Sequence, residues 1–134
     1  MTDADHPIAR WHSIARARDA SQLAALLDES VVFLSPVVHT PQQGRAITTA
    51  YLSAALQVFG NETFRYVREI VGPNDAMLEF ETTVDGVLVN GVDIIHWNDE
   101  GRINEFKVMV RPLKAMQAIH QRMGAMLQQM QGQK

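Results

Sequence analysis

Residues 91–112, GVDIIHWNDEGRINEFKVMVRP, are the stretch that decides the fold. Two runs rich in apolar residues flank the turn residues NDEG at 98–101, and this arrangement predicts two antiparallel strands joined by a tight turn. Asp93 interrupts the first run, between Val92 and Ile94. A carboxylate inside a covered strand is costly unless it has a partner, so Asp93 is the first candidate for a functional role.

The segments before and after this stretch give the order of the elements. Apolar residues at helical spacing predict helices over 5–18, 21–28 and 44–59, with a strand over 30–34. After the third helix the apolar residues recur at every second position. Four strands with short turns are predicted there, over 62–71, 76–84, 87–97 and 102–110. A last helix is predicted over about 112–130.

This order predicts a single α+β domain over residues 1–134. Helices that come before an antiparallel meander pack on one face of a curved sheet. We therefore expect a cone-shaped sheet, closed by the N-terminal helices around a pocket, with an extra helix at the C-terminus.

Composition narrows the classes of function. The net charge of −3 is too small to indicate nucleic acid or an anionic membrane as a partner. The absence of cysteine excludes disulfides, a thiolate nucleophile and thiolate metal ligands. The N-terminus carries no apolar signal segment, and no apolar run approaches the ~20 residues of a membrane helix. We expect a cytoplasmic protein without a membrane partner.

Alternation along the strands assigns their faces. Within 76–84, Leu78 and Phe80 point into the cone, because the glutamates between them must face water. The same rule turns Phe106, Val108 and Val110 inward. In the strand that holds Asp93, both alternating sets are mostly apolar, so both faces must be covered. The helices cover one face, and we expect the second copy of a homodimer to cover the other.

The motif GVDIIHWNDEGRI at 91–103, the stretch SPVVHTPQQGR at 35–45 and the element order resemble the SnoaL-like branch of the nuclear-transport-factor-2-like superfamily. The resemblance covers nearly the whole chain and implies a cone with a deep apolar pocket. Members of that superfamily include ketosteroid isomerase, polyketide cyclases, an epoxide hydrolase and a dehydratase, and other members only bind partners. The fold alone therefore does not fix the activity.

The spacing of the strand motif is similar to that of ketosteroid isomerase. That family has the pattern D-x-x-x-F-x-x-x-G-R-I, and residues 93–103 reproduce it with Trp97 at the aromatic position. The resemblance implies that Asp93 lies inside the pocket. In that family the equivalent acid stays protonated and donates a hydrogen bond to an enolate oxygen.

Two positions depart from the isomerase pattern. Ser35 precedes Pro36 where that family has its proton-abstracting aspartate, and Trp11 corresponds to the tyrosine of its first helix. A serine hydroxyl cannot collect an α-proton near neutral pH without a separate base. Steroid isomerisation as that family performs it is therefore not expected.

Each candidate catalytic group has a structural alternative. Asp93 is either a general acid or base with a raised pKa, or a structural carboxylate bonded to Trp11 or to a backbone amide. His39 is either the missing base beside Ser35 or a solvent-exposed loop residue. Ser35 either contacts a ligand or stabilises the turn before Pro36.

Aromatic and apolar side chains on inward positions are the expected walls of the pocket. The predicted ligand-binding residues are Trp11, Ser35, Tyr51, Phe80, Phe106 and Val110. No histidine spacing suits a metal, and no phosphate-binding loop is present, so neither a metal nor a cofactor is expected. The methionine-rich last helix is expected to pack across the domain or its dimer partner, with a lid as the alternative.

These observations predict a protein that binds a small, largely apolar molecule. If it is an enzyme, we expect cofactor-independent isomerase, cyclase or dehydratase (lyase) chemistry centred on Asp93. The alternative is a non-catalytic ligand-binding or protein-interaction module of the same fold.

Overall fold

The computed structural model describes residues 5–131. The helical elements are α1 (Pro7–Ala17), a 3₁₀ turn η2 (Ala20–Gln22), α2 (Leu23–Leu26), α3 (Arg45–Phe59) and α4 (Leu113–Gln131). The strands are β1 (Leu27–Leu34), β2 (Gln42–Gln43), β3 (Arg65–Val71), β4 (Asp75–Val84), β5 (Val87–Trp97) and β6 (Ile103–Arg111). Within the described residues, no helix is both long and apolar enough to cross a membrane.

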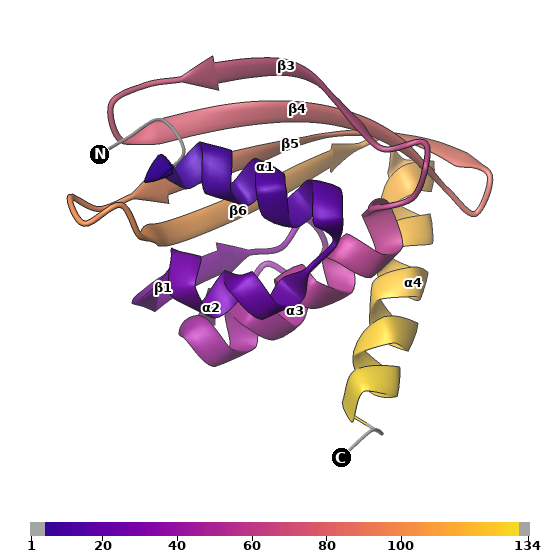
Figure 1. Cartoon of the computed structure of the whole chain (residues 1–134). Helices are drawn as coiled ribbons and strands as arrows, with labels where there is room; N and C mark the ends of the chain where they lie inside the picture. The colour runs from indigo at the N-terminus through magenta and orange to yellow at the C-terminus, as the bar shows by residue number, and fades with distance from the viewer. Residues whose placement is uncertain (1–4, 132–134) are drawn as a thin grey trace.

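The six strands form one curved, unclosed sheet in the order β2-β1-β6-β5-β4-β3 (Figure 1). The predicted meander of β3 to β6 is confirmed, because each of these strands pairs antiparallel with the next. Strand β1 joins the sheet beside β6 and runs parallel to it. The connection through β2 and α3 separates β1 from the meander and permits this parallel pairing, which a short turn could not make.

The β4–β5 hairpin shows how local residues fix the register. Asp85 and Gly86 both have positive φ, 50° and 78°, and Val84 pairs with Val87 across them. Two central residues with positive φ match the twist of the flanking strands, which is why Asp-Gly is favoured there. The register places Leu78 opposite Asp93, and therefore puts both side chains on the same face of the sheet.

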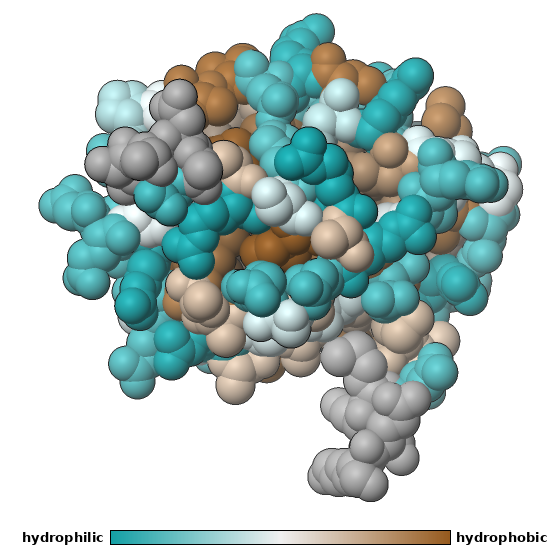
Figure 2. All heavy atoms as spheres, viewed as in Figure 1, coloured by the Kyte–Doolittle hydropathy of each residue, from teal (hydrophilic) through white to brown (hydrophobic). Residues whose placement is uncertain are grey.

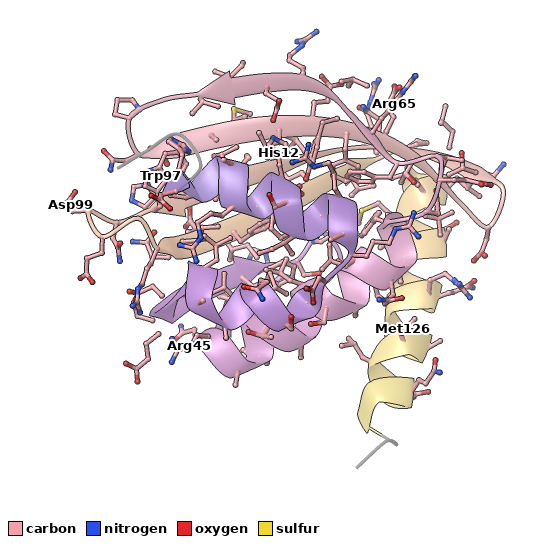
Figure 3. All side chains as sticks on the ribbon, in the orientation of Figure 1. His12, Arg45, Arg65, Trp97, Asp99 and Met126 are labelled. Carbon is pink, nitrogen blue, oxygen red and sulfur yellow. The ribbon has the colours of Figure 1, made fainter. Side chains whose placement is uncertain are left out.

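The helices α1, α2 and α3 cover the concave face of the sheet, and α4 lies beside α3 at one end (Figure 1). Side chains fill the space between the helical layer and the sheet (Figure 3). Burial in β5 alternates strictly, with Asp93 and Ile95 buried and Val92 and Ile94 only partly covered. The expected α+β cone with helices on one face is therefore confirmed.

Two element boundaries differ from the expectation. The helix predicted over 21–28 is a 3₁₀ turn followed by one helical turn, and β1 begins at Leu27 rather than at residue 30. Leu27 is fully buried and pairs with Ile103, so tertiary packing draws it into the sheet. The strand predicted from residue 62 begins at Arg65, because Asn61 Oδ1 accepts a hydrogen bond from the Thr63 amide and holds a turn there.

Candidate active site

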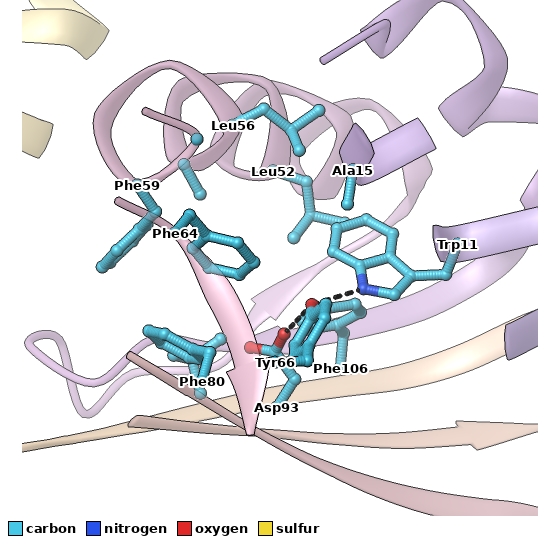
Figure 4. A pocket seen from close by; sticks show the side chains of 13 residues that line it. Trp11, Ala15, Leu52, Leu56, Phe59, Phe64, Tyr66, Phe80, Asp93 and Phe106 are labelled. Carbon is cyan, nitrogen blue, oxygen red and sulfur yellow. Dashed lines mark hydrogen bonds between the residues drawn. The ribbon is translucent and has the colours of Figure 1, made fainter. Parts of the chain in front are cut away.

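A cavity of about 50 Å³ lies between α1, α3 and the concave face of the sheet. Trp11 reaches it from α1, Tyr66 from β3, Phe80 from β4, Asp93 from β5 and Phe106 from β6 (Figure 4). The remaining walls are mostly apolar: Ala15, Leu52, Ala55, Leu56, Phe59, Gly60, Phe64 and Val108. Asp93 is only 6% exposed.

Three polar side chains of this cavity form one hydrogen-bond chain. The Trp11 indole N–H donates to the Tyr66 hydroxyl oxygen at 2.8 Å, and the Tyr66 O–H donates to Asp93 Oδ2 at 2.8 Å (Figure 4). Within residues 5–131, Tyr66 is the one side chain that hydrogen-bonds to Asp93, and it uses only the Oδ2 atom. No described side chain thus donates a hydrogen bond to the other carboxyl oxygen, which lies at an otherwise apolar surface.

Packing holds the members of this chain in place. The Trp11 ring meets the Phe106 ring edge-on, with centroids 5.0 Å apart. The Tyr66 ring is edge-on to both Phe64 and His12, at 5.0 and 5.1 Å. His12 also pairs with Glu69, which ties α1 to β3 above the phenol.

The absence of a side chain at Gly91 makes room for one of the cavity walls. Gly91 pairs with Phe80 across β4 and β5. A Cβ atom at Gly91 would lie 2.8 Å from Phe80 Cε2 and 3.0 Å from the Met109 carbonyl oxygen. Glycine at this position therefore leaves room for the Phe80 ring against β5.

The environment makes Asp93 a group that can hold or release a proton near neutral pH. Burial raises the pKa of Asp93 from 3.8 to about 7, and the hydrogen bond from Tyr66 opposes part of that rise. Burial, with a further contribution from the nearby Asp93 charge, raises the pKa of Tyr66 well above its ordinary value. Tyr66 therefore stays a neutral donor, while Asp93 exchanges between its two protonation states.

The predicted site residues fall into two groups. Trp11, Phe80, Asp93 and Phe106 line the cavity together. The others lie elsewhere. Tyr51 and Ser35 line a neighbouring hollow between α3 and α4.

Ser35, His39 and Val110 share a surface hollow at the end of β1. Ser35 Oγ accepts hydrogen bonds from the Val37 and Val38 amides at 3.1 and 3.3 Å, as the turn-stabilising alternative requires. His39 is exposed and makes no hydrogen bond to Ser35 within the described chain. His39 does not line the cavity that holds Asp93.

Tyr66 and Phe64 are the site residues that alternation did not single out. The register of β3 and β4 shifts between Tyr66 and Arg68. After Tyr66, the next residue that pairs with an inward-facing residue of β4 is therefore Glu69 and not Arg68, so strict alternation fails along β3. Before the shift, Phe64 and Tyr66 are two residues apart and lie on one face. That spacing of two aromatic residues was the available signal.

The way in from solvent is suggested by a polar hollow of about 330 Å³. It shares Ala15, Gly60, Phe64 and Tyr66 with the cavity and adds His12, Arg16, Arg18, Asn61 and Glu62. On the face seen in Figure 2, apolar atoms are visible at the centre between hydrophilic side chains.

Within residues 5–131, no group of three or more His, Asp or Glu side chains is placed to hold a metal ion.

Comparison with known proteins identifies the family. Residues 8–106 match the SnoaL-like domain family, so the chain belongs to that family and to the nuclear-transport-factor-2-like superfamily. A steroid delta-isomerase structure from Pseudomonas aeruginosa is 36% identical, with a TM-score of 0.89 over 94% of this chain and 92% of that one. No protein of curated function matches the sequence significantly.

More distant structures share the fold alone. An NTF2-like protein of unknown function from Mesorhizobium loti is 22% identical, with a TM-score of 0.69 over 79% of this chain and 88% of that one. SalBIII, an epoxide hydrolase/cyclase-like enzyme in pyran ring formation in salinomycin, is 18% identical, with a TM-score of 0.64 over 80% and 89% of the two chains. Isomerase and cyclase-like enzymes thus both occur among proteins of this fold.

Proposed function

We propose that this protein is a cofactor-independent isomerase that moves a proton between two carbons of a small, largely apolar carbonyl compound. The observation that carries the proposal is the Tyr66 O–H donated to Asp93 Oδ2 at 2.8 Å inside an apolar cavity. A carboxyl with a pKa of about 7 can take and return a proton. A neutral phenol beside it can stabilise the charge that develops on the carbonyl oxygen.

The proposed reaction uses each polar group once. The Asp93 carboxylate removes a proton from the carbon next to the carbonyl, and the electron pair moves onto the carbonyl oxygen. Tyr66 turns its O–H from Asp93 to that oxygen and stabilises the enolate. Protonated Asp93 then returns the proton to a carbon further along the conjugated system. Trp11 is a positioning residue, because its N–H bond at 2.8 Å fixes the phenol.

Two further observations support proton transfer and shape the proposal. The similar structure from Pseudomonas aeruginosa is named a steroid delta-isomerase, an enzyme class that shifts a double bond. The cavity here is about 50 Å³, whereas ligand pockets usually hold about 300 Å³ or more. We therefore propose a carbonyl substrate whose reacting end is smaller than a steroid.

The test is turnover of β,γ-unsaturated ketones, beginning with cyclohex-3-enone and including a steroid β,γ-enone. Formation of the conjugated enone is followed by ultraviolet absorbance. Asp93→Asn is expected to lower kcat/KM by about 10²–10⁴-fold, the usual contribution of a general base. Since only ionised Asp93 accepts a proton, kcat/KM of the wild type should rise with pH through about 7.

His39→Ala is the matched control, because His39 is exposed and lies outside the cavity. It should retain wild-type kcat/KM. Turnover that survives Asp93→Asn unchanged, with the same pH profile, would refute the role of Asp93. Tyr66→Phe should lower kcat more than it raises KM, because the phenol acts on the developing oxyanion.

A non-catalytic binding module is the second candidate. The observation that favours it is that Tyr66 and Asp93 are the two titratable side chains in the cavity wall, and they already bond to each other. Ketones that raise the melting temperature and are recovered unchanged after long incubation would support this alternative. Conversion of any ketone that depends on Asp93 would exclude it.

We further propose that a second copy of the chain packs on the convex face of the sheet. Apolar residues are exposed there on several strands: Ile70, Met77, Leu88 and Met109. Beside them Arg68 and Glu79 lie 3.6 Å apart, so the face carries both charge signs and can meet its own copy about a two-fold axis. Homodimer interfaces combine an apolar core with a polar rim, and the exposed apolar residues would supply that core.

Analytical ultracentrifugation of Met77→Glu/Met109→Glu tests this contact. The double variant should sediment as a monomer where the wild type sediments as a dimer. Leu113→Glu is the control, because Leu113 is equally apolar but begins α4, off the sheet face. A wild type that is monomeric at all concentrations would contradict the proposal.

A further inference from the structure

A second cavity of about 180 Å³ lies between α3 and α4. We call it the α4 compartment. Tyr51 lines it from α3, Phe33 from β1, and Ile119, Met123 and Leu127 from α4. Helix α4 lies beyond residues 8–106, the part of the chain that matches the SnoaL-like family. The wall that α4 supplies is thus an addition to the matched segment.

Three residues form the partition between the α4 compartment and the Asp93 cavity. Ala55, Phe59 and Val108 line both spaces. Ala55 lies on α3 and Val108 on β6, next to Asp93 in the register of β5 and β6. Ala55 presents only a methyl group, the smallest side chain of the three.

The chemistry of the α4 compartment suits hydrocarbon. Among the described residues that line it, none is an acid, lysine or arginine, and His120 is the single titratable group besides Tyr51. Met123 lies in its wall, and a thioether side chain adjusts its shape to irregular apolar groups. A charged or strongly polar group would lose its hydration there without gaining a partner.

We propose that the α4 compartment receives the alkyl arm of a substrate whose carbonyl lies at Asp93. The position of the carbonyl rests on the proposed function, whereas the alkyl site rests on the partition and the apolar wall. The substrate class is then an aliphatic ketone of medium chain length. The small Asp93 cavity holds the carbonyl end of the ketone, and the size of the α4 compartment limits the length of the alkyl arm that can bind.

The first experiment measures binding of saturated alkan-2-ones from butanone to undecan-2-one to wild-type protein by calorimetry. Affinity should rise about fourfold for each added methylene while the compartment fills, and then level off. Saturated ketones cannot isomerise by a double-bond shift, so the measurement does not depend on turnover. Affinity independent of chain length would overturn the proposal.

Substitutions on α4 test whether the alkyl arm binds in the α4 compartment. Met123→Trp fills the compartment from α4 and should remove the gain for nonan-2-one while leaving butanone binding unchanged. Ala125→Trp is the matched control, because Ala125 is exposed on the same helix. Folding of both variants is checked by thermal melting.

The outcomes separate this inference from the proposed function. If the ketone series shows the length dependence but no enone is isomerised, the α4 compartment stands and the isomerase proposal fails. If enones are isomerised through Asp93 with no preference for chain length, the isomerase proposal stands and the compartment fails. Equal loss for short and long ketones in Met123→Trp, with a wild-type melting temperature, would also overturn it.

Discussion

Ionisable side chains on the two faces of strand β5 differ in their exposure to solvent. Asp93 points to the concave face, where it is 6% exposed and accepts a hydrogen bond from Tyr66. His96, three residues later, points to the convex face and lies 2.8 Å from Asp75, with both side chains exposed. Water hydrates the convex pair, so that pair contributes little to stability. Protein groups rather than water surround Asp93, and this burial raises the pKa of its carboxyl group.

The difference shows why one carboxyl of this sheet is a candidate catalyst and its neighbours are not. A group in solvent keeps its ordinary hydration, whereas a group under α1 and α3 loses it. On this concave face, Tyr66 donates a hydrogen bond that offsets part of the free-energy cost of desolvating the Asp93 carboxylate. Variants on the two faces should therefore differ in size and in pH dependence.

The largest expected effect is that of Asp93→Asn on stability. Because burial raises the pKa of Asp93 from 3.8 to about 7, the folded protein keeps a proton that the unfolded chain releases between these values. Wild-type stability should therefore fall as pH rises through this window and stay low above it. Removing the charge should raise the free energy of unfolding at about pH 8 by an amount on the order of 4 kcal/mol.

Urea unfolding of wild type and Asp93→Asn across pH measures this effect. Below about pH 3 the two proteins should be equally stable within about 1 kcal/mol, because Asp93 is then protonated in both states. Asp75→Asn on the convex face is the control and should change stability by less than about 1 kcal/mol. A gain in Asp93→Asn that is the same at every pH would contradict the role of burial.

A smaller effect is expected from a methyl group on the concave face. Gly91→Ala places a Cβ 3.0 Å from the Met109 carbonyl oxygen and against the Phe80 ring, and should destabilise by about 1–3 kcal/mol. Gly124→Ala is its counterpart on α4, where no heavy atom lies within 4 Å of the added Cβ. It should stabilise by roughly 0.5–1 kcal/mol, because alanine favours a helix over glycine.

Thermal or chemical unfolding measures the change in stability of both glycine variants, which should be negative for Gly91→Ala and positive for Gly124→Ala. Equal destabilisation in both would show that the concave face is no more tightly packed than α4. That result would weaken the account of how Phe80 is held beside Asp93.

The last expected effect is a change in the acidity of Asp93 rather than in the stability of the fold. Tyr66→Phe removes the hydrogen bond that lowers the pKa of Asp93, so this pKa should rise further above 7. A hydrogen bond to a charged group contributes about 1.5–3 kcal/mol, which corresponds to roughly one to two pKa units. Carbon-13 NMR of the aspartate carboxyls across pH measures the shift. An unchanged midpoint would show that the Tyr66 bond does not act on the charged form.

The sequence predicted the sheet meander because it depends on local alternation and on turn residues such as Asp85 and Gly86. The inward direction of Asp93 came from the resemblance of its strand motif, because both alternating sets of that strand are mostly apolar. The parallel pairing of β1 with β6 was not foreseen, because it depends on how separated segments pack. Tyr66 was missed because a register shift in β3 breaks the alternation just beyond it.

The loop candidates illustrate a second limit of sequence reasoning. Ser35 and His39 were selected for the position of their loop, but a loop has no period that fixes where its side chains point. The structure places both on the surface hollow beside β1, and Ser35 stabilises its own turn. Residues on strands were placed correctly more often because the pleat leaves only two directions, and Val110 is the exception at the end of β6.

One phenolic oxygen joins α1 to the sheet, since Tyr66 accepts from Trp11 and donates to Asp93. The Trp11 bond lowers the pKa of Tyr66, so the phenol is a stronger acid while α1 is seated. A displacement of α1 would break this bond and weaken the phenol as an acid. The seating of one helix therefore sets the acidity of a side chain that belongs to the sheet.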